Sequence, residues 1–130
     1  MLFLISSADL NKFYKMSFTR LQNTFLGNAV LGNFAPLTLR TDVGALWENW
    51  LVSERIKRLS YAQLSARSYF WRTTTQSEID YIEESDGQIT AFEFKWNPRD
   101  KAKLPQSFAS AYPNAAYSVI SRENYDGFLR

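Results

Sequence analysis

Apolar and polar side chains alternate in two short runs near the middle of the chain, residues 78–84 and 89–96. Both runs are rich in β-branched and aromatic residues, and alternation of this kind is typical of β-strands. Between them, the Asp86-Gly87 step supplies residues that tolerate the positive φ of a tight hairpin turn. The pattern therefore predicts two antiparallel strands joined as a β-hairpin.

The segment before the hairpin has the spacing of an amphipathic helix instead. Thr41 or Asp42 can cap its start. The apolar stripe at helical spacing consists of Val43, Leu46, Trp47, Trp50, Leu51 and Leu59. We interpret both tryptophans of this stripe, Trp47 and Trp50, as core residues.

Further strands are expected on both sides of the hairpin. Residues 67–73 alternate as a strand, Pro105 opens and Pro113 ends a short helix, and residues 117–120 read as a last buried strand. A strand-helix-strand unit implies a parallel pair with a right-handed crossover. The predicted fold is α/β, in the order helix, three strands, helix, strand, with a mixed central sheet flanked by helices. Residues 124–130 are expected to be a tail that packs back onto the core.

Charged residues interrupt the hairpin where a buried surface is expected. Asp80 and Glu93 lie at matching distances from the turn, so we expect them to face each other across the hairpin. Lys95 is on the face of Glu93, because alternation separates Ala91, Glu93 and Lys95 from Phe92, Phe94 and Trp96.

Two interpretations of these charges follow. Two nearby carboxylates repel each other unless a cation lies between them, and hard oxygen ligands suit Mg²⁺ or Mn²⁺. Such a metal polarises a phosphoryl oxygen and activates water, while Lys95 could orient that water or offset developing charge. The alternative is a structural cluster of Asp80, Lys95 and Glu93 on a half-wet sheet face, and spacing alone favours it.

Composition narrows the functional classes. A chain of 130 residues, 45% apolar, fits one domain with a single core. The absence of Cys and His excludes zinc sites built on these ligands, disulfides, thiol nucleophiles and Ser-His-Asp hydrolysis. A net charge of only +2 does not by itself indicate a nucleic-acid-binding protein. Any surface that binds nucleic acid must therefore be a local patch of the molecule. No apolar run reaches membrane-spanning length, so we expect a cytoplasmic protein without a membrane partner.

A glycine-rich segment, residues 27–32, imitates the start of a P-loop. Asn33 and Phe34 stand where the Lys and the Ser or Thr of that motif must be. The chain is therefore not expected to be an ATPase by itself.

Asp80, followed after about a dozen residues by Glu93-Phe94-Lys95, resembles the PD-(D/E)xK signature of restriction-endonuclease-like nucleases. From about Asn28 to the C-terminus, the sequence also resembles the uncharacterised C-terminal domain of prokaryotic AAA-type ATPases. The blocks that carry this second resemblance are Arg40–Asn49, Glu54-Arg55, Tyr69–Arg72, Glu78–Tyr81 and Phe92–Lys95. The upstream ATPase module is not in this sequence, so we expect a stand-alone domain, a truncated gene product or an excised piece.

The resemblance implies a restriction-endonuclease-like core over residues 36–130, preceded by an N-terminal extension, residues 1–35. It also implies a site, with Asp80 and Glu93 as ligands of Mg²⁺ or Mn²⁺. The implied catalytic residues are Glu48, Asp80, Glu93 and Lys95. For Glu48, an exposed helix acid is the simpler interpretation; Gly44, one turn earlier, would allow a strand or ligand to approach closely.

The expected function is metal-dependent hydrolysis of DNA or RNA. The loop residues Arg99, Lys101 and Lys103 would contact the phosphate backbone; otherwise they form a solvated loop. The main alternative is a non-catalytic nuclease-fold module that binds nucleic acid or an AAA-type ATPase in cis or in trans. A third is a decayed fragment, since the segment before Asn28 departs from the family pattern. Strandedness of the substrate and oligomeric state do not follow from the sequence.

Overall fold

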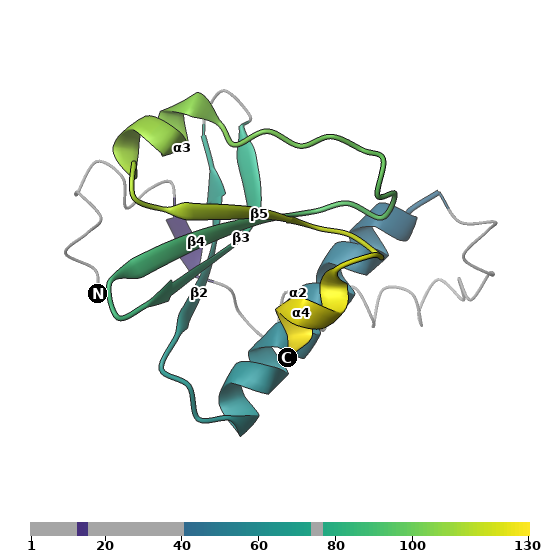
Figure 1. The fold of residues 1–130 in the computed structure, drawn as a ribbon, viewed down its shortest axis with the longest axis horizontal. Coiled ribbons are helices and arrows are strands. Elements are labelled where there is room, and N and C mark those ends of the chain that lie inside the picture. Colours follow the sequence, from purple (N-terminus) through teal and green to yellow (C-terminus); the bar gives the residue numbers. More distant parts are fainter. Residues whose placement is uncertain (1–12, 16–40, 74–76) are drawn as a thin grey trace.

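The computed structural model describes residues 13–15, 41–73 and 77–130. A mixed sheet in the order β1-β2-β3-β4-β5 carries the helices on its two faces (Figure 1). Its neighbours are antiparallel except β4 and β5, which are parallel. The elements are β1 (Phe13–Lys15), α2 (Val43–Tyr61), β2 (Arg67–Arg72), β3 (Glu78–Ser85), β4 (Gln88–Phe94), α3 (Gln106–Ala111), β5 (Ala116–Ile120) and α4 (Tyr125–Leu129).

This architecture confirms the predicted α/β class and the order helix, three strands, helix, strand. Two elements were not predicted. The expected C-terminal tail forms α4, whose Phe128 is buried in the core. In addition, β1 lies within the predicted N-terminal extension and pairs with β2. None of the helices in the described residues is long and apolar enough to cross a membrane.

The β3–β4 hairpin follows from its turn residues. Asp86 and Gly87 have φ values of 51° and 80°. Two consecutive residues with positive φ are the geometry of a type I′ turn, which matches the twist of paired strands. The register runs from Ser85↔Gln88 at the turn to Tyr81↔Phe92.

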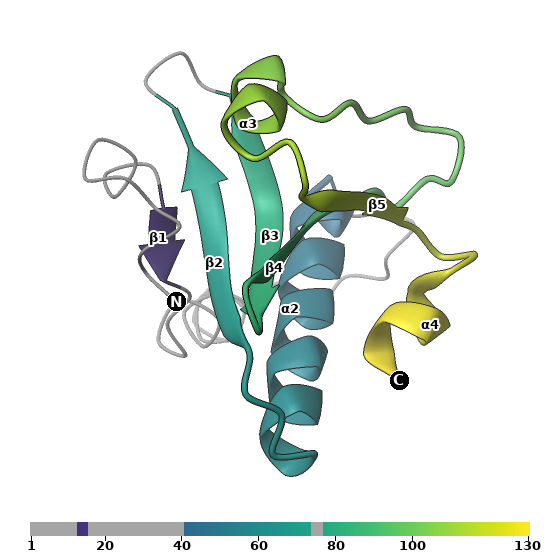
Figure 2. The same ribbon diagram turned by 60° about the vertical axis from the view of Figure 1, so that its left-hand side comes forward.

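Two apolar clusters lie on opposite faces of the sheet. On one face, α2 and α4 pack with Leu51 and Phe128 against Tyr81 and Phe94. On the other face, α3 packs Phe108 into a cluster that includes Tyr69, Trp71, Ile79, Ile82 and Ala91. Figure 2 shows α3 on the far side of the sheet from α2. The predicted separation of Ala91 from Phe92, Phe94 and Trp96 is therefore confirmed.

Two details of α2 correct the sequence interpretation. Asp42 occupies the N-cap position but makes no side-chain cap hydrogen bond. Trp50 is 43% exposed and is not a core residue. It stacks on Trp47 at 5.4 Å between ring centroids, at the margin of the apolar face of the helix. Trp47 is buried as predicted.

A β-bulge interrupts β3. Its register with β2 changes between Tyr69↔Ile82 and Trp71↔Ile79, so Asp80 and Tyr81 together lie opposite Phe70. Strict alternation would have placed Ile79 and Ile82 on different faces, yet both belong to the cluster under α3. The extra residue restores their common face, and bulges of this kind re-aim side chains, often beside functional sites.

Candidate active site

The two strands of the hairpin separate just beyond the bulge (Figure 2). The last pair of the β3–β4 ladder is Tyr81↔Phe92. Beyond it, the main-chain N–H of Phe94 donates to Oδ2 of Asp80 at 2.9 Å. A side-chain carboxylate therefore takes the place of a main-chain acceptor and is fixed at the opening between β3 and β4.

The other predicted catalytic residues act electrostatically on this carboxylate. The pKa of Asp80 is raised to about 7 by burial, which is the largest effect, and by the negative charges of Glu48 and Glu93, while the Phe94 N–H and Lys95 oppose the shift. Nζ of Lys95 lies 3.2 Å from Oε1 of Glu93. The structure thus brings Glu48 of α2, Glu93 of β4 and Lys95 just after β4 within electrostatic range of Asp80.

Glu48 reaches the site from the second turn of α2. It is half-buried, and with Asp80 it lines a small pocket of about 20 Å³ between the helix and the start of β3. That volume suits one water-sized occupant. In the described part of the chain no strand approaches Gly44, which is exposed and where a Cβ would meet no atom within 4 Å; the approach of a ligand stays a prediction. Glu48 reaches the site without a close approach at Gly44.

Asp80 and Glu93 carry hard oxygen donors, the kind of ligand that Mg²⁺ and Mn²⁺ prefer. Among residues 41–73 and 77–130, no three Asp or Glu side chains are close enough together to hold a metal ion. Mg²⁺ is commonly bound through only one or two carboxylates and completed by water. A half-buried carboxyl with a raised pKa beside two acids is an environment that a cation relieves. Asp80 and Glu93 are therefore suitable ligands for Mg²⁺ or Mn²⁺.

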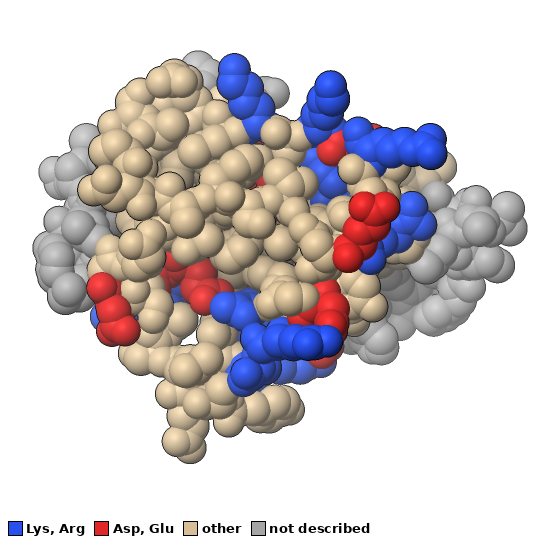
Figure 3. Space-filling model, in the orientation of Figure 1, with Lys and Arg blue, Asp and Glu red and all other residues tan. Residues whose placement is uncertain are grey.

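The three predicted nucleic-acid-binding residues lie in the loop between β4 and α3. Arg99, Lys101 and Lys103 are all exposed. Figure 3 shows Lys and Arg side chains projecting over the edge of the molecule that carries this loop. The loop begins two residues after Lys95, so the basic side chains follow the candidate site directly along the chain.

Sequence reasoning missed Arg122, which meets this loop in space. The sequence did indicate that Arg122 lies near this loop. Arg122 follows the predicted last strand just as Asn97 follows the hairpin. Parallel strands end at the same edge of a sheet, where ligands of α/β proteins commonly bind. The predicted parallel pair β4–β5 therefore already implied that residues after both strands would be neighbours.

Arg55, which also belongs to the resembling blocks, has a structural role. Its guanidinium forms two hydrogen bonds with Glu83, at 2.9 and 2.8 Å, and donates to the Phe128 carbonyl oxygen at 2.7 Å. Tyr81 donates its hydroxyl to the same carboxylate at 3.0 Å. These contacts connect α2 to β3 and to α4 on the face of the sheet that α2 covers.

The fold and this site define a small α/β domain with a cluster of acids and one lysine beside a bulged hairpin. Residues 43–127 match the domain of unknown function DUF4143, and the chain belongs to this family. The match runs from the first residue of α2 into α4. No curated protein and no solved structure matches the chain.

Proposed function

We propose that this protein is a metal-dependent nuclease that hydrolyses phosphodiester bonds in DNA or RNA. One observation carries the proposal: the Asp80 carboxylate lies beside the bulge in β3, accepts the Phe94 N–H where the two strands separate, and is within electrostatic reach of Glu48, Glu93 and Lys95. This arrangement supports the resemblance to PD-(D/E)xK nucleases, whose signature spans the same strands. In-line attack by a metal-activated water needs this set of residues and no covalent nucleophile.

Each residue has a defined role in this proposal. Asp80 and Glu93 would hold Mg²⁺ or Mn²⁺, and the bound metal would supply Lewis-acid polarisation and a water of lowered pKa. Lys95 would orient the attacking water or offset charge that develops on the phosphate. Glu48 would assist by orienting the groups around Asp80. The exposed Arg99, Lys101 and Lys103 would bind the phosphate backbone.

The resemblance to ATPase C-terminal domains supports an AAA-type ATPase as a partner, in cis or in trans. A cytoplasmic location agrees with the absence of cysteine.

Metal binding is the first test, because it needs no knowledge of the substrate. In a calorimetric titration with Mn²⁺, we expect saturable binding to the wild type and none to Asp80→Asn or Glu93→Gln. The control is Glu54→Gln, an exposed acid on the same helix as Glu48 that pairs with Lys57, and it should bind like the wild type. Equal Mn²⁺ affinity in all four proteins would refute the assigned ligands.

Cleavage is the second part of the same test. Single- and double-stranded DNA and RNA would be incubated with Mg²⁺ or Mn²⁺ and the wild type or Lys95→Ala. Loss of one group that stabilises charge in the transition state lowers a rate by about 10²-fold or more. We expect that loss in Lys95→Ala with an unchanged circular dichroism spectrum, and undiminished cleavage would contradict the role of Lys95.

A non-catalytic binding module is the second candidate function. The observation in its favour is the direct contact of Lys95 with Glu93 at 3.2 Å, in which the carboxylate already has a cationic partner. In that case the charged cluster is structural and the basic loop alone engages nucleic acid. Nucleic-acid binding without Mn²⁺ binding or cleavage would favour this second function.

A further inference from the structure

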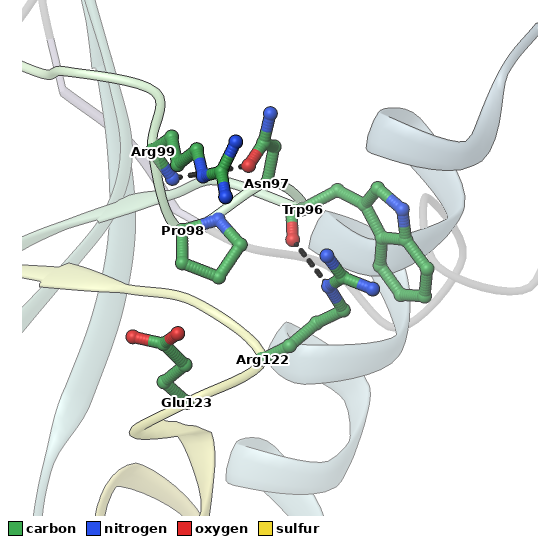
Figure 4. A pocket seen from close by; sticks show the side chains of 6 residues that line it. All are labelled: Trp96, Asn97, Pro98, Arg99, Arg122 and Glu123. Carbon is green, nitrogen blue, oxygen red and sulfur yellow. Dashed lines mark hydrogen bonds between the residues drawn. The ribbon is translucent and has the colours of Figure 1, made fainter.

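A pocket opens at the edge of the sheet where the parallel strands β4 and β5 end. Its volume is about 480 Å³, within the range of about 300–1,000 Å³ typical of small-molecule sites. Trp96 to Arg99 follow β4 and form one wall, and Arg122 and Glu123 follow β5 and form the other (Figure 4). Two segments far apart in the sequence thus build one site.

Trp96 holds the Arg122 side chain in place. Nε of Arg122 donates to the Trp96 carbonyl oxygen at 2.9 Å, and its guanidinium carbon lies 4.6 Å from the centroid of the Trp96 ring. The same ring packs edge-on against buried Trp47, at 5.4 Å between centroids. A guanidinium has four further N–H groups besides Nε. Arg122 is therefore an exposed cation that is already oriented for a ligand.

The other wall is fixed by a turn after β4. Oδ1 of Asn97 accepts the main-chain N–H of Arg99 at 3.0 Å, and the Asn97 carbonyl oxygen accepts that of Asp100 at 3.1 Å. In Figure 4 the Pro98 ring lies between Arg99 and Glu123, with the Glu123 carboxylate beneath it in that view. The pocket therefore offers two cations, one carboxylate acceptor and the apolar surface of a proline ring.

This combination has the chemistry of a nucleotide site. The planar fork of an arginine matches the oxygens of a phosphate, and two arginines outweigh one carboxylate. The Glu123 carboxylate can accept from a base amino group or a sugar hydroxyl, and Pro98 offers an apolar surface to a base. A purely anionic ligand would leave Glu123 opposed to it, whereas a nucleotide has donors for that carboxylate.

The position of the pocket relates it to the candidate active site. Asn97 follows Lys95 by two residues, so their Cα atoms are at most about 7 Å apart. Successive nucleotides of one strand rise about 3.4 Å each in a duplex. A strand whose reacting phosphate lies at Lys95 would therefore bring a neighbouring nucleotide, one or two positions away, to the pocket.

We propose that this pocket binds a nucleotide unit of the substrate strand next to the cleaved bond, with Arg122 and Arg99 on its phosphate. The assignment of a substrate strand rests on the proposed nuclease function. Arg122 is then a substrate-binding residue that no sequence motif indicated, and Trp96 positions it.

Binding without metal tests this assignment separately from cleavage. The affinity of a short fluorescein-labelled single strand would be measured by fluorescence anisotropy in EDTA, for the wild type, Arg122→Gln, Arg99→Gln and the control Arg58→Gln. Arg58 is an exposed arginine near the end of α2. We expect about tenfold weaker binding for each pocket variant, and a slope of log K against log salt that is shallower by about 0.7 per lost phosphate contact. The control should match the wild type.

Each outcome decides one of the two proposals. Wild-type affinity in both Arg122→Gln and Arg99→Gln would overturn the pocket assignment, even if the protein cleaves nucleic acid. Loss of affinity in both variants, without any cleavage by the wild type, would keep the nucleotide site and overturn the nuclease. A free mononucleotide that competes as well as the oligonucleotide would overturn the assignment to a strand. If Arg122→Gln lost its circular dichroism signal, Arg99→Gln would decide.

Discussion

Asp80 is the residue on which the candidate site depends, and its protonation links the site to stability. Its pKa is raised from 3.8 to about 7 in the folded protein, chiefly by burial and by the charge of Glu48. In the unfolded chain the pKa is about 3.9. Between these two values the folded state binds a proton that the unfolded state does not. Without metal, this carboxyl therefore makes the protein less stable as the pH rises from about 4 to about 7.

This loss of stability with rising pH gives a prediction for Asp80→Asn in metal-free buffer. The amide cannot ionise, but its oxygen can still accept the Phe94 N–H. Since one pKa unit corresponds to about 1.4 kcal/mol, we expect the variant to have a free energy of unfolding about 1–3 kcal/mol higher than the wild type at pH 8. Near pH 4 the two should agree. Urea denaturation across this range measures the difference, and a variant less stable than the wild type at pH 8 would contradict the raised pKa.

The position of Asp80 was partly predictable. Counting from the Asp-Gly turn placed it opposite Glu93, and the hairpin register agrees with that count as far as Tyr81↔Phe92. The bulge was not predicted, because alternation alone does not reveal an inserted residue. Ile79 and Ile82 bear the trace of the bulge: they are three positions apart, which strict alternation would place on opposite faces, yet they share a face in the structure. Since the Phe94 N–H becomes available only where the strands separate, its bond to Asp80 could not be predicted either.

The hydrogen bonds of Arg55 connect three elements of the fold, α2, β3 and α4. The side chains of Arg55 and Glu83 are only 17% and 13% exposed. Glu83 also raises the pKa of Tyr81, beyond the larger effect of burial, so the Tyr81 hydroxyl stays neutral and donates to Glu83, and only the Glu83 carboxylate needs a positive charge beside it. Arg55 supplies that charge and donates to the Phe128 carbonyl oxygen of α4. The helical stripe predicted which face of α2 is buried, but a sequence pattern does not identify the partner of a charged residue 28 positions away.

Replacement of Arg55 by Met therefore should destabilise the fold. Breaking a buried pair leaves an uncompensated carboxylate, which costs about 3–5 kcal/mol for a fully buried pair. For this partly exposed pair we expect about 2–4 kcal/mol in urea denaturation. The double variant Arg55→Met/Glu83→Gln should recover part of the loss. Lys57→Met, which breaks an exposed pair on the same helix, is the control, with an expected change below about 1 kcal/mol. Equal losses for Arg55→Met and Lys57→Met would show that the Arg55 contacts contribute little.

The whole molecule was easier to predict than its site. Hydrophobic periodicity and turn residues gave the class, the order of the main elements and the parallel pair, because each is a local pattern or follows from right-handed crossover. The joining of β1 to the sheet was not predicted, since residues 13–15 have no clear period of their own. The pocket beyond β4 and β5 depends on which loops meet, and that is a property of the assembled sheet.

Charge distribution over the whole molecule also matters more than the total of +2. The exposed cations Lys101 and Lys103 lie on the loop after β4, whereas Lys57 and Arg58 lie near the far end of α2 (Figure 1). If the loop follows the phosphate backbone, Lys101→Gln/Lys103→Gln should weaken binding of single strands. Counterion release gives about 0.7 in the salt slope for each phosphate contact, so the slope should become shallower by about 1.4.

The matched variant Lys57→Gln/Arg58→Gln removes the same formal charge from the other end of the molecule. A protein that attracted nucleic acid only through its net charge would respond equally to both changes, at low salt above all. A localised interface predicts instead that the loop variant alone loses affinity at physiological salt, where charges more than about 8 Å apart are largely screened. Equal losses of affinity in the two double variants would show that Lys101 and Lys103 do not belong to the binding surface. A selective loss would place the path of the strand along the β4–α3 loop, beside both the Asp80 site and the Arg122 pocket.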